Sequence, residues 1–157
     1  MRNTAAARAV PQSAEKGLGD PKYFYKDDFT YNVGLTGSLA ANASQSTTFN
    51  IDGDSDFFLV KTTVHALVAD DGTTYSANIL ASVTVLITDT TSGRALMNEP
   101  VPLPNVAGTA QLPFIWPIVR LFAAKSTIKV DFANMTDNTT YSDIELSFVG
   151  IKAFFAR

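Results

Sequence analysis

A chain of 157 residues with a net charge of −3 has room for one domain and is too short for two of ordinary size. It contains no cysteine and one histidine, which excludes disulfide frameworks, thiolate zinc sites, iron–sulfur clusters, cysteine nucleophiles and multi-histidine metal centres. Hydrophobic residues make up 46% of the sequence and charged residues 17%, which is the composition of a folded domain rather than of a disordered chain.

Charge is divided unevenly along the sequence. Residues 1–26 contain five basic and two acidic side chains, for a net charge of +3, whereas residues 27–157 contain seven basic and thirteen acidic ones, for −6. An acidic body repels phosphate, so this distribution argues against nucleic acid as a partner. The sequence contains no run of 18 to 20 apolar residues and no signal-peptide core, so it predicts no association with a membrane.

We interpret residues 1–26 as an extended N-terminal arm that precedes a body at residues 27–157. The residues of this arm that we expect to contact a partner are Arg2, Arg8, Lys16, Tyr23, Phe24 and Tyr25. A basic arm can dock on an acidic surface, the body of a neighbouring copy included, and a solvated arm without a partner is the alternative. The three aromatic residues either anchor the arm or close one end of the core.

From Phe29 onward, apolar and polar residues alternate in the manner of β-strands. The segments with this pattern are 29–36, 49–51, 57–68, 79–87, 94–97, 128–132 and 144–155. Turn sequences separate them, among them Asp52-Gly53-Asp54, Asp70-Asp71-Gly72, residues 89–93 and residues 134–140. The polar segment Ser38–Ser46 makes a poor strand. Five prolines between Pro100 and Pro117 exclude a helix interior or a central strand there.

These segments predict an all-β fold, because no window of a dozen residues repeats with the 3.6-residue period of a helix. Seven to nine strands separated by turns are typical of an antiparallel β-sandwich, and we favour a jelly roll among its topologies. Near the C-terminus, the apolar residues shift from even to odd positions at Gly150, which predicts a β-bulge at that point.

The sequence Asp52-Gly-Asp54-Ser-Asp56 resembles the start of a calcium-binding loop. Such a loop also requires glycine at its sixth position and glutamate at its twelfth, and Phe57 and Thr63 occupy those positions. We therefore interpret the segment as an acidic turn, with a weak cation site shared with a neighbouring subunit as the alternative.

The remaining candidates for chemistry also have structural interpretations. His65 lies within an apolar strand and has no nucleophile nearby in the sequence, so we expect a structural histidine. Trp116 lies between two prolines and is expected to face the core; the alternative is a sugar-stacking site with Tyr75 and Tyr141. Arg120 is placed to bridge to an acidic residue of an adjacent strand or of a second subunit. We predict no enzyme, no cofactor and no metal.

The C-terminal part of the sequence carries a resemblance to a known group of proteins. Its motifs are Leu112-Pro-Phe-Ile-Trp-Pro-Ile-Val-Arg-Leu-Phe122, Ala124-Lys-Ser-Thr-Ile-Lys-Val130, Asn134, Thr136, Tyr141 and Leu146-Ser-Phe-Val-Gly-Ile-Lys152. Together with the segment from Ile51 to Phe58, they resemble the small auxiliary capsid proteins, the cement or decoration proteins, of tailed bacteriophages. The resemblance covers residues 49–155 and does not include the first 26 residues.

The resemblance implies a sandwich fold without chemistry, on the exterior of the capsid, after synthesis in the host cytoplasm. It implies binding across the seams between subunits of the major capsid protein, and it supplies no active-site residues. We also expect self-association, with a dimer favoured over a trimer. The alternative function is a carbohydrate- or receptor-binding module of a head fibre or tail, whose site includes the Asp52–Asp56 loop.

Overall fold

The structure, a computed structural model, describes residues 19–70, 74–77 and 82–156. Within these residues the chain forms eleven strands and one turn of 3-10 helix. The elements are β1 (Tyr23–Gly34), β2 (Ser38–Leu39), β3 (Ser44–Asn50), β4 (Ser55–Asp70), β5 (Thr74–Ala77), β6 (Val83–Asp89), β7 (Arg94–Ala95), β8 (Val101–Pro102), η1 (Leu103–Asn105), β9 (Phe114–Phe122), β10 (Thr127–Asn134) and β11 (Tyr141–Phe155). Arg2, Arg8 and Lys16 of the predicted arm lie outside the described residues.

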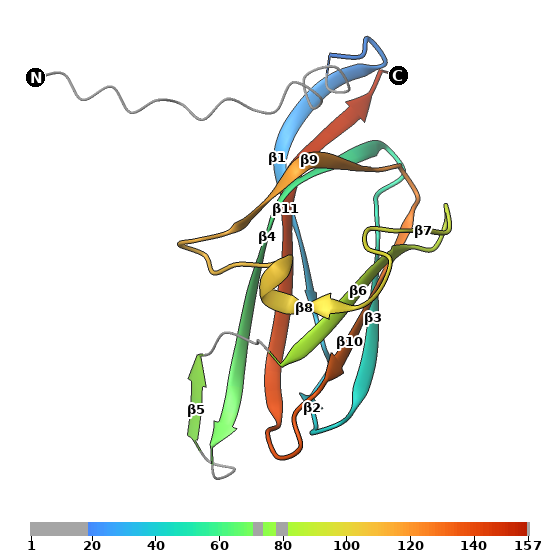
Figure 1. The fold of residues 1–157 in the computed structure, drawn as a ribbon. Coiled ribbons are helices and arrows are strands. Elements are labelled where there is room, and N and C mark those ends of the chain that lie inside the picture. Colours follow the sequence, from blue (N-terminus) through green and yellow to red (C-terminus); the bar gives the residue numbers. More distant parts are fainter. Residues whose placement is uncertain (1–18, 71–73, 78–81, 157) are drawn as a thin grey trace, which may run out of the picture.

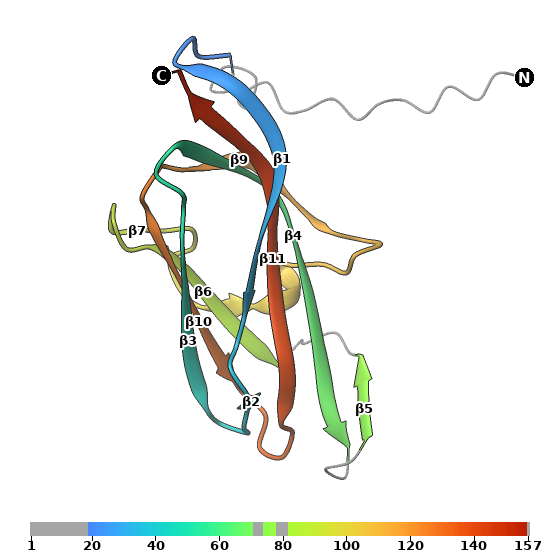
Figure 2. The ribbon, with the colours of Figure 1, turned by 180° about the vertical axis from the view of Figure 1, so that it is seen from behind.

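The strands form two antiparallel sheets that pack as a sandwich (Figures 1 and 2). A six-stranded sheet has the order β1-β11-β4-β5, with β2 also paired to β11 and β9 also paired to β4. A five-stranded sheet has the order β3-β10-β6-β7, with β8 also paired to β6. The predicted all-β sandwich is therefore confirmed. At one end, β1 and β11 continue together beyond the rest of the sandwich, which Figure 1 shows at the top.

The core lies between the sheets and follows the alternation expected from the sequence. In β10 and β6, every second residue is buried, because successive side chains of a strand point to opposite faces. The buried apolar side chains of these two strands are Val83, Val85, Ile87, Ile128, Val130 and Phe132, and each strand ends in a buried polar residue, Asp89 or Asn134. From the opposite sheet they are covered by Phe57, Leu59, Ile144, Leu146 and Phe148. Of the segment 79–87, residues 79–81 lie outside the described residues, as do Asp71 and Gly72.

Two segments differ from the expected strand boundaries. β1 begins at Tyr23, so the division between residues 26 and 27 falls inside a strand that pairs with β11 over its whole length. The polar segment Ser38–Ser46 contains β2 and the first residues of β3, whose hydrogen-bonding partners come from distant parts of the sequence. Cross-strand pairing thus outweighs the poor local preference of serine and asparagine for a strand.

The last part of the proline-rich segment, which contains Pro117, forms the edge strand β9 of the six-stranded sheet. β9 pairs only with β4, and its register shifts between the pairs Leu59–Arg120 and Lys61–Ile115. Four residues of β9 therefore stand opposite one residue of β4, and Pro117 lies among them. Proline cannot donate a backbone hydrogen bond, so an edge strand with a local irregularity is the place where it fits in a sheet.

The irregularity predicted at Gly150 is present. Val149 pairs with Lys61 and Gly150 pairs with Leu59, which leaves Val60 of β4 as the extra residue. A Cβ atom on Gly150 would lie 2.0 Å from the carbonyl oxygen of Phe58, so only glycine fits at this position. The bulge thus lies in the neighbouring strand, and the alternation of buried residues in β11 continues past Gly150 to the buried Lys152.

Candidate functional site

The projecting ends of β1 and β11 carry a cluster of aromatic side chains, which we call the aromatic tip. It consists of Tyr23, Phe24, Tyr25, Phe154 and Phe155. Tyr23 stacks on Phe155 with 6.0 Å between ring centroids, and Tyr25 lies against Phe154 at 5.9 Å. Phe24 falls at the register shift between these two pairs, and 85% of its surface is exposed. The tip thus presents a large apolar side chain to solvent from a paired ribbon.

A pocket of about 350 Å³ adjoins the aromatic tip. It is lined by Phe24, Asp54, Phe154, Phe155 and Ala156. Pockets lined mainly by aromatic rings gain free energy when they cover an apolar group of a ligand or of a partner protein. Phe24, which lines this pocket, is a large apolar side chain that a partner protein could cover.

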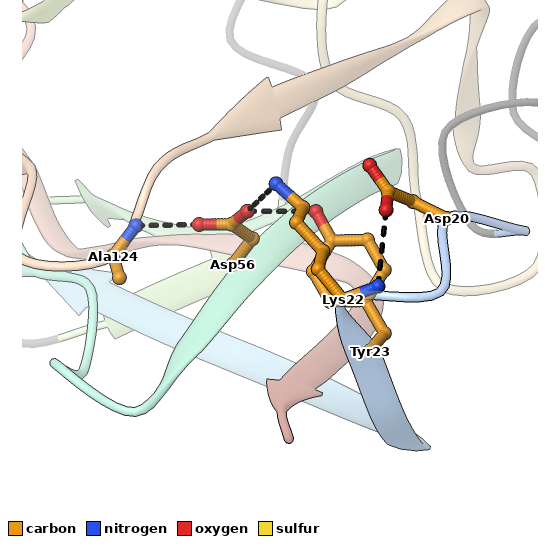
Figure 3. Close-up of polar contacts among 5 residues, drawn as sticks. All are labelled: Asp20, Lys22, Tyr23, Asp56 and Ala124. Carbon is orange, nitrogen blue, oxygen red and sulfur yellow. Dashed lines mark hydrogen bonds and ion pairs between the residues drawn. The ribbon is translucent and has the colours of Figure 1, made fainter. Parts of the chain in front are cut away.

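A buried carboxylate fixes the start of β1 to the body (Figure 3). Asp56, which is 4% exposed, accepts hydrogen bonds from Tyr23 Oη at 2.7 Å, from the backbone N–H of Ala124 at 2.8 Å and from Lys22 Nζ at 3.1 Å. The turn before β1 is closed by Asp20, whose carboxylate accepts the N–H of Lys22 at 3.0 Å. We call Asp56 with its three donors the Asp56 latch.

The latch also determines the charge of its members. Burial alone would raise the pKa of Asp56, but the hydrogen bonds from Tyr23, Ala124 and Lys22 outweigh it and hold that pKa below its usual value. Burial, and then the hydrogen bond to the carboxylate, raise the pKa of Tyr23. Hydrogen bonds with Tyr23 and Asp56 raise the pKa of Lys22. Near neutral pH, the latch therefore joins an ionised carboxylate to a neutral phenol and an ammonium group.

A second ion pair joins β11 to the turn that precedes β4. Lys152 of β11 is 5% exposed, pairs with Asp52, and lies over the ring of Phe29 at 3.7 Å from its centroid and over that of Tyr31 at 5.3 Å. The hydrogen bond from Lys152 lowers the pKa of Asp52. Burial opposes the charge of Lys152, yet the hydrogen bond to Asp52 and the charges nearby raise its pKa.

The acidic turn Asp52–Asp56 is thus an anchor for lysines. Its first and last carboxylates each bind an ammonium group, one on β11 and one at the start of β1. The described residues contain no group of three or more histidine or acidic side chains arranged to hold a metal ion. They also contain no helix long and apolar enough to cross a membrane.

The sequence-predicted residues divide into separate places. Tyr23, Phe24 and Tyr25 come together at the tip, whereas Arg120 lies in β9 and lines a different pocket. Arg120 forms no ion pair with the described residues; its guanidinium lies over the ring of Trp116, 5.7 Å from the centroid. His65 is exposed on β4, opposite Glu145 of β11.

Two of the three aromatic residues of the sugar-binding alternative are buried. Trp116 and Tyr141 are 5% and 6% exposed and belong to the core, which confirms that Trp116 faces inward. Tyr75 lies in β5 on the far side of β4 from β11. Sugar-binding aromatic residues offer a ring face to the ligand, and the burial of two of these three rings removes that possibility for them.

The sequence assigns no role to Lys22, Phe154 and Phe155, and it places Asp56 in an acidic turn without indicating its contacts with the start of β1. A signal was available, because an aromatic pair at the end of the last strand matches the cluster Tyr23-Phe24-Tyr25 if the first and last strands are neighbours. In comparisons with protein-family models and with curated proteins, none matches this chain.

Proposed function

We propose that the chain is a structural virion protein, a cement or decoration protein that stabilises a phage head by binding across coat-protein subunits. The observation that carries the proposal is the aromatic tip, where Phe24 is 85% exposed on a ribbon held in place by the Asp56 latch. An exposed and rigid aromatic side chain gains free energy when a partner covers it, at little cost in ordering. The resemblance of residues 49–155 to such proteins supports the same function.

The order of the strands supports a jelly roll as the finer description of the sandwich. The strands β1-β11-β4-β9 lie in one sheet and β3-β10-β6-β7 in the other. Most connections therefore cross from one sheet to the other, as in the paired Greek keys of a jelly roll. This topology occurs in viral capsid proteins and in lectins, so its support for a capsid role is an analogy of fold.

Charge supports a contact that combines the tip with the N-terminal arm. The arm ends at the tip, since β1 begins at Tyr23, and residues 1–26 carry a net charge of +3. The proposed partners are the major capsid protein and other copies of this chain, whose acidic bodies attract a basic arm. In this proposal the chain catalyses no reaction, and it stabilises the capsid by burying surface across the contact between coat-protein subunits.

The test uses particles of the phage whose genome encodes the chain. We expect mass spectrometry to detect the chain in purified virions, and we expect recombinant protein to bind to particles stripped of it. Phe24→Ser is expected to weaken this binding by about tenfold or more, because a central aromatic anchor contributes at least about 2 kcal/mol to an interface. Absence of the chain from virions overturns the proposal.

A matched control separates the tip from exposed apolar residues in general. Met135 is 65% exposed and follows β10, at the opposite end of the sandwich from the tip (Figure 1). Met135→Ser removes a comparable apolar side chain and is expected to leave particle binding within about twofold of the parent protein, as for an exposed residue outside the contact. Equal effects of the two substitutions would argue against the tip as the docking surface.

The contribution of the arm requires a truncation that preserves the latch. A chain that begins at Gly19 retains Asp20, Lys22 and Tyr23, whereas one that begins at Asp27 removes two of the three donors to Asp56. We expect the chain from Gly19 to bind particles more weakly and with less dependence on salt concentration, because it lacks Arg2, Arg8 and Lys16, three of the five basic residues of the arm. Light scattering after size exclusion measures self-association of both chains.

A further inference from the structure

A second pocket, which shares no lining residue with the pocket at the aromatic tip, lies between β9 and the β6–β7 hairpin. Its volume is about 340 Å³, at the lower end of the range in which small-molecule sites fall. The lining residues are Asp89, Ser92, Arg94, Ala95, Leu96, Val119, Arg120, Leu121, Phe122 and Ala123. Two arginines therefore face a cavity whose remaining walls are mostly apolar.

Arg120 has hydrogen-bonding capacity that the described residues leave unused. Its Nε is buried and has no hydrogen-bond partner among these residues, although a buried nitrogen of this kind is costly to leave unpaired. The face of Trp116 holds the guanidinium from one side at 5.7 Å. Neither Arg120 nor Arg94 forms an ion pair within the described part of the chain.

The acidic residue of the pocket already has partners. The carboxylate of Asp89 accepts the N–H groups of Thr91 and Ser92 at 3.0 and 3.2 Å and the hydroxyl of Ser92 at 2.7 Å. These bonds close the turn between β6 and β7 and direct the carboxylate toward the backbone. The two guanidinium groups and the one carboxylate give the pocket a net charge of +1. The carboxylate of a ligand would neutralise this charge, whereas a phosphate dianion would leave an excess negative charge.

From this arrangement we infer that the pocket binds the carboxylate of a small molecule with an apolar body. The carboxylate pairs with Arg120 and Arg94, and the apolar body lies along the apolar part of the lining, which includes Leu96. This inference is independent of the proposed role in a capsid, because it rests on a pocket that the aromatic tip does not share.

The test uses the full chain and two probes of the same shape, hexanoate and its uncharged amide, hexanamide. Binding is followed by shifts of backbone amide resonances and by the fluorescence of Trp116, the single tryptophan of the chain and a neighbour of Arg120. We expect hexanoate to shift the amides of residues 89–96 and 119–123 in a saturable manner at constant ionic strength. Hexanamide and inorganic phosphate are expected to bind at least about tenfold more weakly, since each lacks either the charge or the apolar fit.

Substitutions identify the arginines as the binding groups. Arg120→Met keeps the apolar part of the side chain and is expected to weaken hexanoate binding at least about tenfold, which corresponds to about 1.4 kcal/mol. Arg94→Gln, at an exposed position of β7, removes the second positive charge without disturbing the core and is expected to weaken binding in the same direction. Lys26→Gln removes an exposed charge from β1 and serves as the control, with binding expected to be unchanged.

Several results would overturn the inference. Undetectable hexanoate binding by the parent protein, or equal binding by the Arg120→Met variant, would exclude the pocket as a carboxylate site. Tighter binding of phosphate than of hexanoate would exclude this ligand class. Loss of particle binding in Arg120→Met, without hexanoate binding by the parent, would assign the arginine to an acidic side chain of a partner protein instead.

Discussion

Replacement of Asp56 by asparagine tests whether the latch holds the aromatic tip in place. Asparagine has nearly the same volume as aspartate and keeps one acceptor oxygen, so the change removes charge rather than packing. Asp56 is 4% exposed and accepts three hydrogen bonds. The variant leaves all three donors without a charged acceptor and places an amide NH2 opposite at least one of them. Tyr23 Oη, at 2.7 Å, is the most affected donor because its ring packs against Phe58 and Phe155.

The magnitude follows from the three contacts. A hydrogen bond to a charged group contributes about 1.5–3 kcal/mol, and the bonds from Tyr23 and Ala124 fall in this class. Lys22 contributes less than about 1 kcal/mol, because its side chain is 47% exposed and solvent screens the pair. Since asparagine retains part of these interactions, we expect Asp56→Asn to lower the free energy of unfolding by about 3 kcal/mol, or the melting temperature by about 6–12 °C.

Chemical denaturation as a function of pH is the assay. The pKa of Asp56 in the folded protein lies below its ordinary value of 3.8, so its contribution to stability is present above that value and is lost as the pH falls through the folded-state pKa. The stability difference between the parent protein and Asp56→Asn is therefore constant near neutral pH and shrinks in acid. A difference below about 0.5 kcal/mol at pH 7, the range of ordinary surface substitutions, would refute the reasoning.

Two further predictions concern β11. Gly150→Ala places a Cβ atom 2.0 Å from the carbonyl oxygen of Phe58 and is expected to cost at least about 3 kcal/mol of folding stability, measured by denaturant titration. Gly34→Ala is the control, because the nearest atom to its Cβ lies at 3.5 Å, and it should cost less than about 1 kcal/mol. The pKa of Lys152 is raised in the folded protein, so its contribution is present below its ordinary pKa of 10.5 and is lost as the pH rises through the folded-state value. Lys152→Met should flatten the fall in melting temperature above pH 10.5, and an unchanged profile would contradict the role of its pair with Asp52.

Strands with one buried face could be predicted because burial enforces alternation of apolar and polar residues. The segments 57–68 and 128–132 accordingly fall within β4 and β10. The two-residue strand β2 could not be predicted, because its pairing depends on Tyr141 and Ser142 rather than on its own residues. The bulge at Gly150 could be located from the shift in the apolar pattern. Its extra residue, Val60, becomes evident only from the pairing with β4.

The candidate site could be predicted only where its residues are close in sequence. The cluster Tyr23-Phe24-Tyr25 is contiguous and evident in the sequence, but the partners of Asp56 lie 33 and 34 residues before it and 68 residues after it. The pair between Lys152 and Asp52 spans 100 residues. The spacing of Asp52, Asp54 and Asp56 resembles that of cation ligands. The sequence does not indicate that lysines occupy two of these carboxylates, because only the fold brings the lysines close to them.

The latch and the tip together lead to a prediction that separates rigidity from contact. If Phe24 meets the partner directly, Phe24→Ser weakens particle binding while folding stability stays within about 0.5 kcal/mol of the parent, since the exposed ring packs on little. Asp56 is buried and does not contact the partner. Asp56→Asn makes the start of β1 more mobile, so binding must then pay the conformational entropy of ordering it, about 0.5–1.5 kcal/mol for each side chain that becomes fixed.

Particle binding measured well below the melting temperature of both variants distinguishes the two effects. We expect Asp56→Asn to weaken binding several-fold through a slower association or a faster dissociation, even though the body remains folded. The double variant should lose less than the sum of the two single losses, because a tip without Phe24 gains little from being held rigid. Strict additivity would mean that Asp56 affects binding independently of Phe24. Unchanged binding by Asp56→Asn alone would mean that the latch acts on folding stability only.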